Sequence, residues 1–238
     1  MNDNNIQAKD EAGGLINLSE VTLEEVRQNN KARIFIEKAN DYLGNLGYTE
    51  HGFRHTELVA KVARNILLDL KYSPRQAELA AIAGYLHDIG NVAGREGHDH
   101  SGALIAMDVL ESLGMPTEEV AEVVSAIGNH DVDEGKVVNC VAAALILSDK
   151  ADVHRSRVRN PDFSTFDIHD RVNYAVKESN LRVDREQGVI TLGLNIDKDI
   201  SQVMEYFEIF LSRMIMCRRA AAFLDTRFGL IINGAQLL

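Results

Sequence analysis

Apolar residues recur every three to four positions through most of residues 21–150, which is the period of one face of an α-helix. Capping residues before these segments, and glycine or proline after several of them, mark where the helices should begin and end. We therefore expect a mainly α domain. Its predicted helices span residues 22–46, 55–70, 74–87, 98–113, 118–127 and 137–149.

The predicted helix over residues 74–87 is apolar on more than one side, as expected for a helix packed among several others. Ser73 is its predicted N-cap, with Pro74 at the first helical position. The helix ends in His87-Asp88, two polar groups that need a partner when they are buried. A metal ion would be such a partner.

The last third of the chain has a different pattern. Alternating apolar positions predict strands over residues 181–185 and 189–196, joined through Gln187-Gly188 as a hairpin. A long amphipathic helix should follow over residues 200–223, and residues 230–232 are a candidate third strand. We expect a weakly ordered N-terminus (1–20), a helical metal-binding domain (21–160) and a small C-terminal α+β subdomain (161–238).

Composition and charge limit the classes of partner. The 238 residues carry a formal net charge of −11, which argues against binding of a nucleic-acid polymer but allows a small phosphorylated substrate held by local cations. No apolar run of 18 residues and no signal-like segment is present, so we expect no membrane association and a cytoplasmic protein. Cys140 and Cys217 lack a CxxC partner and should be reduced thiols.

Six of the eight histidines lie between His51 and His130. A single histidine is often a surface or capping residue, but this group accompanies Asp88 and Asp149 at the ends of predicted helices. Imidazole and carboxylate ligands suit Fe, Mn, Ni, Zn or Mg better than thiolate-preferring ions. Catalytic metal sites also leave positions open for water or substrate. The sequence therefore predicts a divalent metal site holding one or two ions.

Three motifs occur in a specific order: HxxxVA at residues 55–60, YLHDIG at residues 85–90 and LSDKAD at residues 147–152. In this order they resemble the HD-domain metal-dependent phosphohydrolases over roughly residues 30–160. The resemblance implies an HD-domain helical bundle. It also implies that one metal is bound by His55, His87, Asp88 and Asp149.

Branches of this family that bind two metals have further histidines after the His-Asp pair. His98 begins an H-x-x-x-G-A segment of that kind, with His100 as the alternative register, and His130 matches the second member of a later His-His pair. The resemblance thus implies a second metal on His98 and His130, bridged by Asp88. His51 is more typical of a loop or an N-cap. We expect His154 and His169 to be surface residues.

A phosphorylated substrate also requires cations. Lys150 follows the last aspartate directly, and we expect it to act in catalysis together with Asp88. Arg155, Arg157 and Arg159 alternate just beyond and are candidate substrate-binding residues, because guanidinium groups match phosphate oxygens bidentately. The alternative for each arginine is a solvated surface pair. Arg54 and Glu96 are candidates for orienting the ligands.

The resemblance implies hydrolysis of a phosphorylated small molecule, most plausibly a nucleotide, by metal-activated water. Two alternatives use the same residues: a di-iron oxygenase of the HD-domain type, and a non-catalytic nucleotide-sensing module. The Gly-Tyr-Pro signature of cyclic-dinucleotide phosphodiesterases is absent after His130, which disfavours that substrate. The apolar surface of the predicted helix over residues 200–223 suggests a homodimer.

Overall fold

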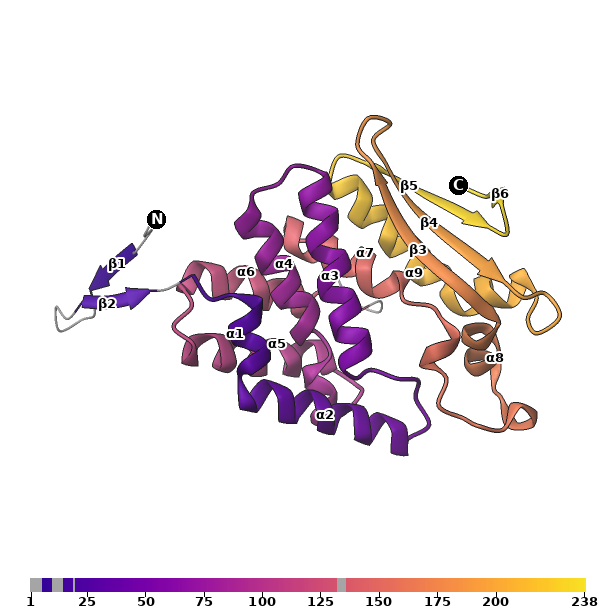
Figure 1. The fold of residues 1–238 in the computed structure, drawn as a ribbon, viewed down its shortest axis with the longest axis horizontal. Coiled ribbons are helices and arrows are strands. Elements are labelled where there is room, and N and C mark those ends of the chain that lie inside the picture. Colours follow the sequence, from indigo (N-terminus) through magenta and orange to yellow (C-terminus); the bar gives the residue numbers. More distant parts are fainter. Residues whose placement is uncertain (1–5, 10–14, 19, 132–135) are drawn as a thin grey trace.

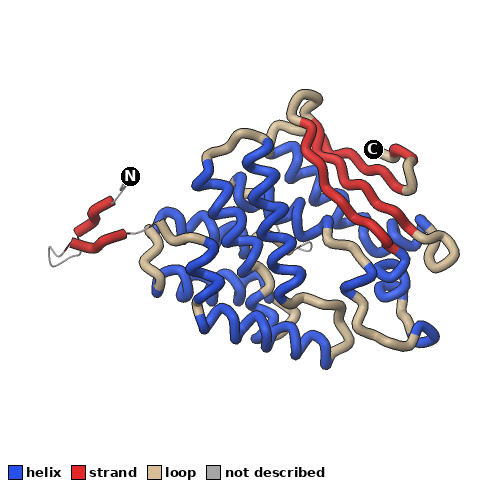
Figure 2. The backbone as a smooth tube through the Cα atoms, in the orientation of Figure 1, coloured by secondary structure: helices blue, strands red, loops and turns tan. Residues whose placement is uncertain are grey.

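The structure, a computed structural model, describes residues 6–9, 15–18, 20–131 and 136–238. Its helical part is a bundle, and a small sheet lies at one edge of it (Figures 1 and 2). This arrangement confirms the predicted fold class, a mainly α bundle with a C-terminal α+β part. The helices of the bundle are α1 (Leu23–Gln28), α2 (Asn30–Asn45), α3 (Phe53–Asp69), α4 (Pro74–Leu86), α5 (His98–Ser112), α6 (Thr117–Ile127) and α7 (Cys140–Ala151).

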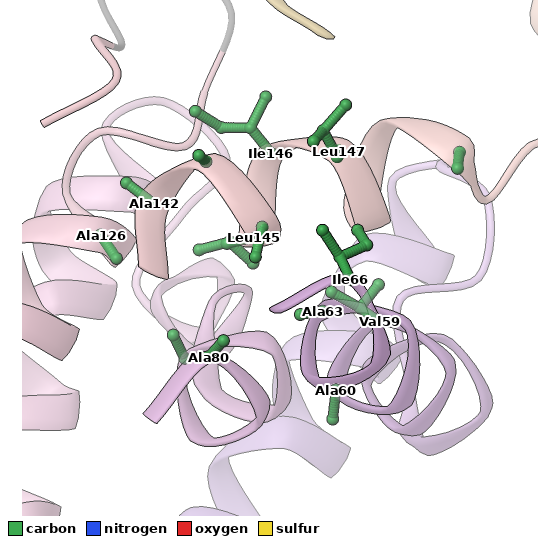
Figure 3. Close-up of a cluster of buried hydrophobic side chains, with 14 of the residues drawn as sticks. Val59, Ala60, Ala63, Ile66, Ala80, Ala126, Ala142, Leu145, Ile146 and Leu147 are labelled. Carbon is green, nitrogen blue, oxygen red and sulfur yellow. The ribbon is translucent and has the colours of Figure 1, made fainter. Parts of the chain in front are cut away.

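Helix α4 is the centre of the bundle, where α3, α6 and α7 pack around it. Most of its side chains are buried, as its apolar positions predicted, and its N-terminus has the predicted Ser73 capping box. Figure 3 shows Leu145 on the side of α7 that faces Ala80 of α4 and Ala63 of α3. Small residues let these helices approach closely. A Cβ atom on Gly84 would lie only 2.8 Å from Cα of Ala60.

The predicted helix over residues 22–46 is wrong as a single element, because it is broken at Asn29. Asn29 has an extended backbone (φ −66°, ψ 117°) and separates α1 from α2. Its side chain accepts a hydrogen bond from the amide of Ala32, while its own amide donates to the carbonyl of Val26. Asparagine is a strong N-cap residue, so a new helix begins after Asn29 although the apolar periodicity continues through it.

The C-terminal part contains a four-stranded sheet in the order β3-β4-β5-β6. Strands β3 and β4 form the predicted antiparallel hairpin, and β5 pairs in parallel with β4 after the chain crosses over through α9. Ile190 and Leu192 of β4 are among the side chains that this packing buries. The elements here are η2 (Arg155–Arg157), η3 (Phe163–Thr165), α8 (Ile168–Ala175), β3 (Val176–Asp184), β4 (Val189–Ile196), α9 (Val203–Phe223), β5 (Arg227–Ile232) and β6 (Ala235–Gln236).

Several details of this part differ from the sequence prediction. Helix α8 was not predicted, and β3 begins at Val176 instead of Leu181. The predicted third strand exists but begins at Arg227. Helix α8 has only eight residues, and polar and charged residues dominate the first half of β3, so neither segment gave a clear signal.

The N-terminal prediction of weak order falls partly on residues 1–5, 10–14 and 19, which lie outside the described residues. The described segments β1 (Ile6–Lys9) and β2 (Leu15–Leu18) pair as antiparallel strands. In the described ranges, none of the helices combines the length and the apolar character that a membrane span requires. The domain boundaries at residues 20 and 160 stay a prediction.

Candidate metal centre

Five ends of helices meet inside the bundle and carry the predicted metal-ligand residues. The first turn of α3 supplies His55, the residues directly after α4 are His87 and Asp88, and the last turn of α7 holds Asp149. His98 is the first residue of α5, and His130 lies two residues after Gly128, the C-cap of α6. All four histidines are buried to within 1% of full burial. The structure thus brings together these six predicted residues: His55, His87, Asp88, His98, His130 and Asp149.

The side chains form two overlapping sets of candidate ligands. His55, His87 and Asp149 offer ligand atoms within 4.8 Å of one another, and so do His87, Asp88 and His130. Asp88 faces both halves of the cluster: its Oδ2 lies 3.2 Å from Nε2 of His87, and its Oδ1 lies 3.5 Å from Nε2 of His98. This placement agrees with a carboxylate that bridges two ions. The assignment of individual ligands stays a prediction.

Each histidine of the cluster is held through its Nδ1 atom, so its Nε2 atom points inward. Nδ1 of His87 lies 2.8 Å from the carbonyl oxygen of Gly84, and Nδ1 of His130 lies 2.6 Å from that of Ile127. His98 contacts the carbonyl of Arg95 at 3.0 Å in the same way. Because a carbonyl can only accept, Nδ1 carries the hydrogen. A neutral ring then directs the Nε2 lone pair at the cluster, as metal ligation requires.

A cation fits this donor set. Oδ2 of Asp88 is buried and has no hydrogen-bond partner among the described residues, which is costly for a carboxylate. Burial lowers the pKa of His87, yet the adjacent Asp88 and Asp149 outweigh it and raise this pKa to about 10. The carboxylates of Asp88 and Asp149 therefore favour a positively charged group in this site. Burial, reinforced by the charge of His87, instead lowers the pKa of His130 to about 3, which keeps that ring neutral.

His98 and His100, the two alternative ligands in the sequence prediction, lie in different environments. His98 is in the cluster, whereas the His100 side chain is 67% exposed and lies beside Asp99. Two glycines allow the N-terminus of α5 to reach the His-Asp pair: a Cβ atom on Gly90 would lie 2.0 Å from the carbonyl oxygen of His98. Gly102 of α5 packs against the backbone of the His-Asp segment, where its Cβ would lie 3.2 Å from the amide nitrogen of Gly90. This close contact sets the register that puts His98 inside.

Asp152 supports the cluster and was not predicted as a site residue. Its Oδ2 lies 2.7 Å from Nδ1 of His55, and it also accepts a hydrogen bond from Arg54 at 2.8 Å. Burial raises the pKa of Asp152, but His55, Arg157 and Arg54 hold it well below its usual range. Arg54 thus takes the supporting position that the sequence suggested. Asp152 closes the LSDKAD motif, three residues after Asp149, so the signal was present.

The predicted cationic residues do not converge on one point. Lys150 is buried and donates from Nζ to Oδ2 of Asp149 at 2.6 Å. Arg157 is also buried, where it binds the carbonyl oxygens of Glu50 and Asp152. Arg155 stacks on the ring of Tyr174, and Arg159 lies on the surface, bound to Asn40 of α2. Only Arg157 of the three arginines lines a cavity next to the cluster.

Two cavities that share part of their walls adjoin the cluster. One has a volume of about 350 Å³ and the other about 850 Å³, and Tyr48, Arg95, His169 and Arg213 line both. Arg95 links them to the cluster, because its Nη1 lies 3.8 Å from Oδ1 of Asp88. Glu96, the other residue suggested to orient ligands, lines the larger cavity instead.

The three remaining histidines are spread around this region. His51 is a loop residue before α3, as expected, but its ring centroid lies 5.6 Å from that of His55 and it lines the smaller cavity. His169 is exposed at the mouth of both cavities. His154 lies away from them, with Nε2 3.0 Å from the carbonyl oxygen of Lys177. The cavity residues Tyr48, Arg95 and Arg213 carry no motif, so the sequence gave no signal for them.

Comparison with known proteins agrees with this geometry. Residues 52–155 match the HD domain family, and this part of the chain is therefore a domain of the HD superfamily, as its motifs indicated. Proteins of this superfamily bind divalent metals and are generally metal-dependent phosphohydrolases. The chain is also similar to an uncharacterized protein of Methanocaldococcus jannaschii, with 28% identity over 221 residues that cover 82% of this chain and 85% of the relative.

Proposed function

We propose that this protein is a metal-dependent phosphohydrolase acting on a phosphorylated small molecule, most plausibly a nucleotide. The observation that carries the proposal is the position of Asp88 between the two histidine groups, with Oδ2 buried and without a hydrogen-bond partner in the part of the chain that the structure describes. Arg95, which lines the adjoining cavity together with Arg157 and Arg213, has its Nη1 3.8 Å from Oδ1 of that carboxylate. The candidate metal centre therefore lies beside cavities whose lining includes arginines that can bind an anion.

The residues of this chain have distinct roles in the proposal. His55, His87, Asp88 and Asp149 would hold one divalent ion, and His98 and His130 with Asp88 a second. Bound divalent ions supply Lewis acids that lower the pKa of water and offset charge on phosphoryl oxygens.

The protein groups around the ligands orient them and neutralise charge. Asp152 fixes the ring of His55 through Nδ1. Lys150 offsets the charge of Asp149 and, through that 2.6 Å contact, restrains its carboxylate. Arg95 places a guanidinium between the cluster and the cavity, where it can neutralise an incoming phosphate.

The test is chromatographic detection of the hydrolysis products, whether inorganic phosphate or a nucleoside monophosphate, from a panel of nucleoside mono-, di- and cyclic phosphates, run separately with Mn, Fe, Ni, Zn and Mg. Wild-type protein should hydrolyse at least one compound, and Asp88→Asn should lose at least 99% of that rate. Asp184→Asn, which changes an exposed carboxylate at the end of β3, is the matched control. Absence of any hydrolysis product with every metal would refute the proposal. Oxygen uptake with iron would favour the oxygenase, and nucleotide binding without turnover would favour the sensing module.

A further inference from the structure

Arg213 is a basic residue that the C-terminal part contributes to the cavities beside the metal centre. It lies on α9, and its guanidinium carbon is 4.5 Å from the ring centroid of Phe210. Within residues 20–131 and 136–238 it makes no hydrogen bond and no ion pair. A guanidinium has five donors, so all of them remain for water or a ligand.

The surroundings of Arg213 make an unpaired cation unfavourable. Burial lowers the pKa of Arg213, the carboxylate of Asp149 raises it, and the like charges of Arg157 and Arg95 lower it further. Arg157 donates to two carbonyl oxygens, and Arg95 donates to Oδ1 of Asn91 at 3.2 Å. Arg213 alone has no such partner. An anion in the cavity would offset three positive charges and give Arg213 an acceptor.

Another part of the wall of the smaller cavity carries acidic side chains. Asp167, the N-cap of α8, and Asp170 and Asn173 within that helix lie three residues apart and therefore share one side of it. Burial and the charge of Asp167 raise the pKa of Asp170, which indicates a carboxylate short of cationic partners. The cavity thus has one wall that carries Arg213 on α9 and another that carries Asp167 and Asp170 at the start of α8.

We propose that Arg213 and Arg95 together bind a phosphate group of the substrate, so that the C-terminal subdomain completes the substrate site of the HD domain. The two walls orient an organic phosphate with its phosphate toward α9 and with hydrogen-bond donors of its other end toward α8. The link to hydrolysis rests on the proposed function, but anion binding can be measured without turnover.

The experiment is calorimetric titration of inorganic phosphate into full-length, chelator-treated protein. Arg213→Met keeps the aliphatic contact with Phe210 and removes the charge, and should weaken phosphate binding about tenfold, the size expected for a lost charged hydrogen-bond pair. Arg213→Lys should recover part of the affinity. Arg218→Met, an exposed arginine on the same helix, should match wild type. Asp170→Asn should leave binding unchanged or strengthen it, because it removes a negative charge.

The outcomes separate this inference from the proposed hydrolysis. Phosphate binding that is equal in wild type and Arg213→Met, or that is lost equally in Arg218→Met, would overturn the role of Arg213 even in an active hydrolase. Selective loss in Arg213→Met would support it even if no compound were hydrolysed. In an active enzyme, Arg213→Met should raise KM more than it lowers kcat, whereas general damage to the fold would lower the melting temperature as well.

Discussion

Nδ1 of His55 lies 2.7 Å from Oδ2 of Asp152, a contact between residues 97 positions apart in the chain. It joins the first turn of α3 to the C-cap of α7, two of the helix ends that form the cluster. The hydrogen bond sets the tautomer and the ring orientation of His55, and the carboxylate makes the ring a stronger donor through Nε2. Asp152 therefore positions a candidate ligand without facing the metal itself.

Asp152→Asn should weaken metal binding by about tenfold to a hundredfold, because the amide can still accept from Nδ1 but no longer carries charge. Competition with a chelator of known affinity measures the change. Asp162→Asn, on an exposed carboxylate, is the control. Equal metal affinity in Asp152→Asn and wild type would show that the contact with His55 is only structural.

Asp88→Ala should strip bound metal and abolish activity, because Asp88 contacts both histidine groups. His130→Ala should cost the second ion selectively, so that about two ions per chain fall to about one. Elemental analysis of protein purified without added metal or chelator measures the number of metal ions per chain. Loss of both ions, or of neither, in His130→Ala would contradict the proposed division of the two sites.

Gly90→Ala should destabilise the protein by about 1–3 kcal/mol, because a Cβ atom at this position would overlap the backbone at the start of α5. The substitution should also weaken metal binding at the His98 side of the cluster, because the carbonyl oxygen of His98 is the atom nearest to the added Cβ. Thermal unfolding and metal content measure the two effects. Gly128→Ala is the matched control, since its Cβ would make only ordinary contacts at 3.4 Å and beyond. Equal melting temperatures for the two variants would contradict this account.

Cys217 should be unreactive in the native protein at pH 8. Burial raises the pKa of its thiol to about 12, so almost none of the reactive thiolate exists at that pH. Cys140 is half-buried, and burial raises its pKa as well. Labelling with a thiol reagent in the Cys140→Ser variant isolates Cys217, which should react only after unfolding. Rapid labelling of that native variant would show that α9 opens readily.

The expected homodimer stays a prediction. Met204 and Leu211 are 69% and 54% exposed on α9, and a second copy of the chain could cover them. Sedimentation at micromolar concentration should show a dimer, and Leu211→Lys should shift it toward monomer because a buried lysine charge is costly. A wild-type monomer at that concentration would end this expectation.

Local sequence determined much of the bundle and the identity of its candidate ligands. Apolar periodicity and capping residues act within one or two turns of a helix, so α3 to α7 were predictable from the chain alone. The His87-Asp88 pair, His55 and Asp149 lie at helix ends within short motifs, so their positions were predictable from local sequence as well. The caps were informative even where the prediction failed: Asn29 divides α1 from α2 through a side-chain bond to the adjacent turn.

Tertiary structure alone decided where the long side chains point and which distant groups meet. Arg155, Arg157 and Arg159 alternate in sequence, yet packing sends them to Tyr174, to buried carbonyls and to α2. The register of His98 depends on backbone contact at Gly90, and Arg213 reaches the cavity only because α9 packs on α7. Such contacts join segments far apart in the chain, and no periodicity within one segment records them.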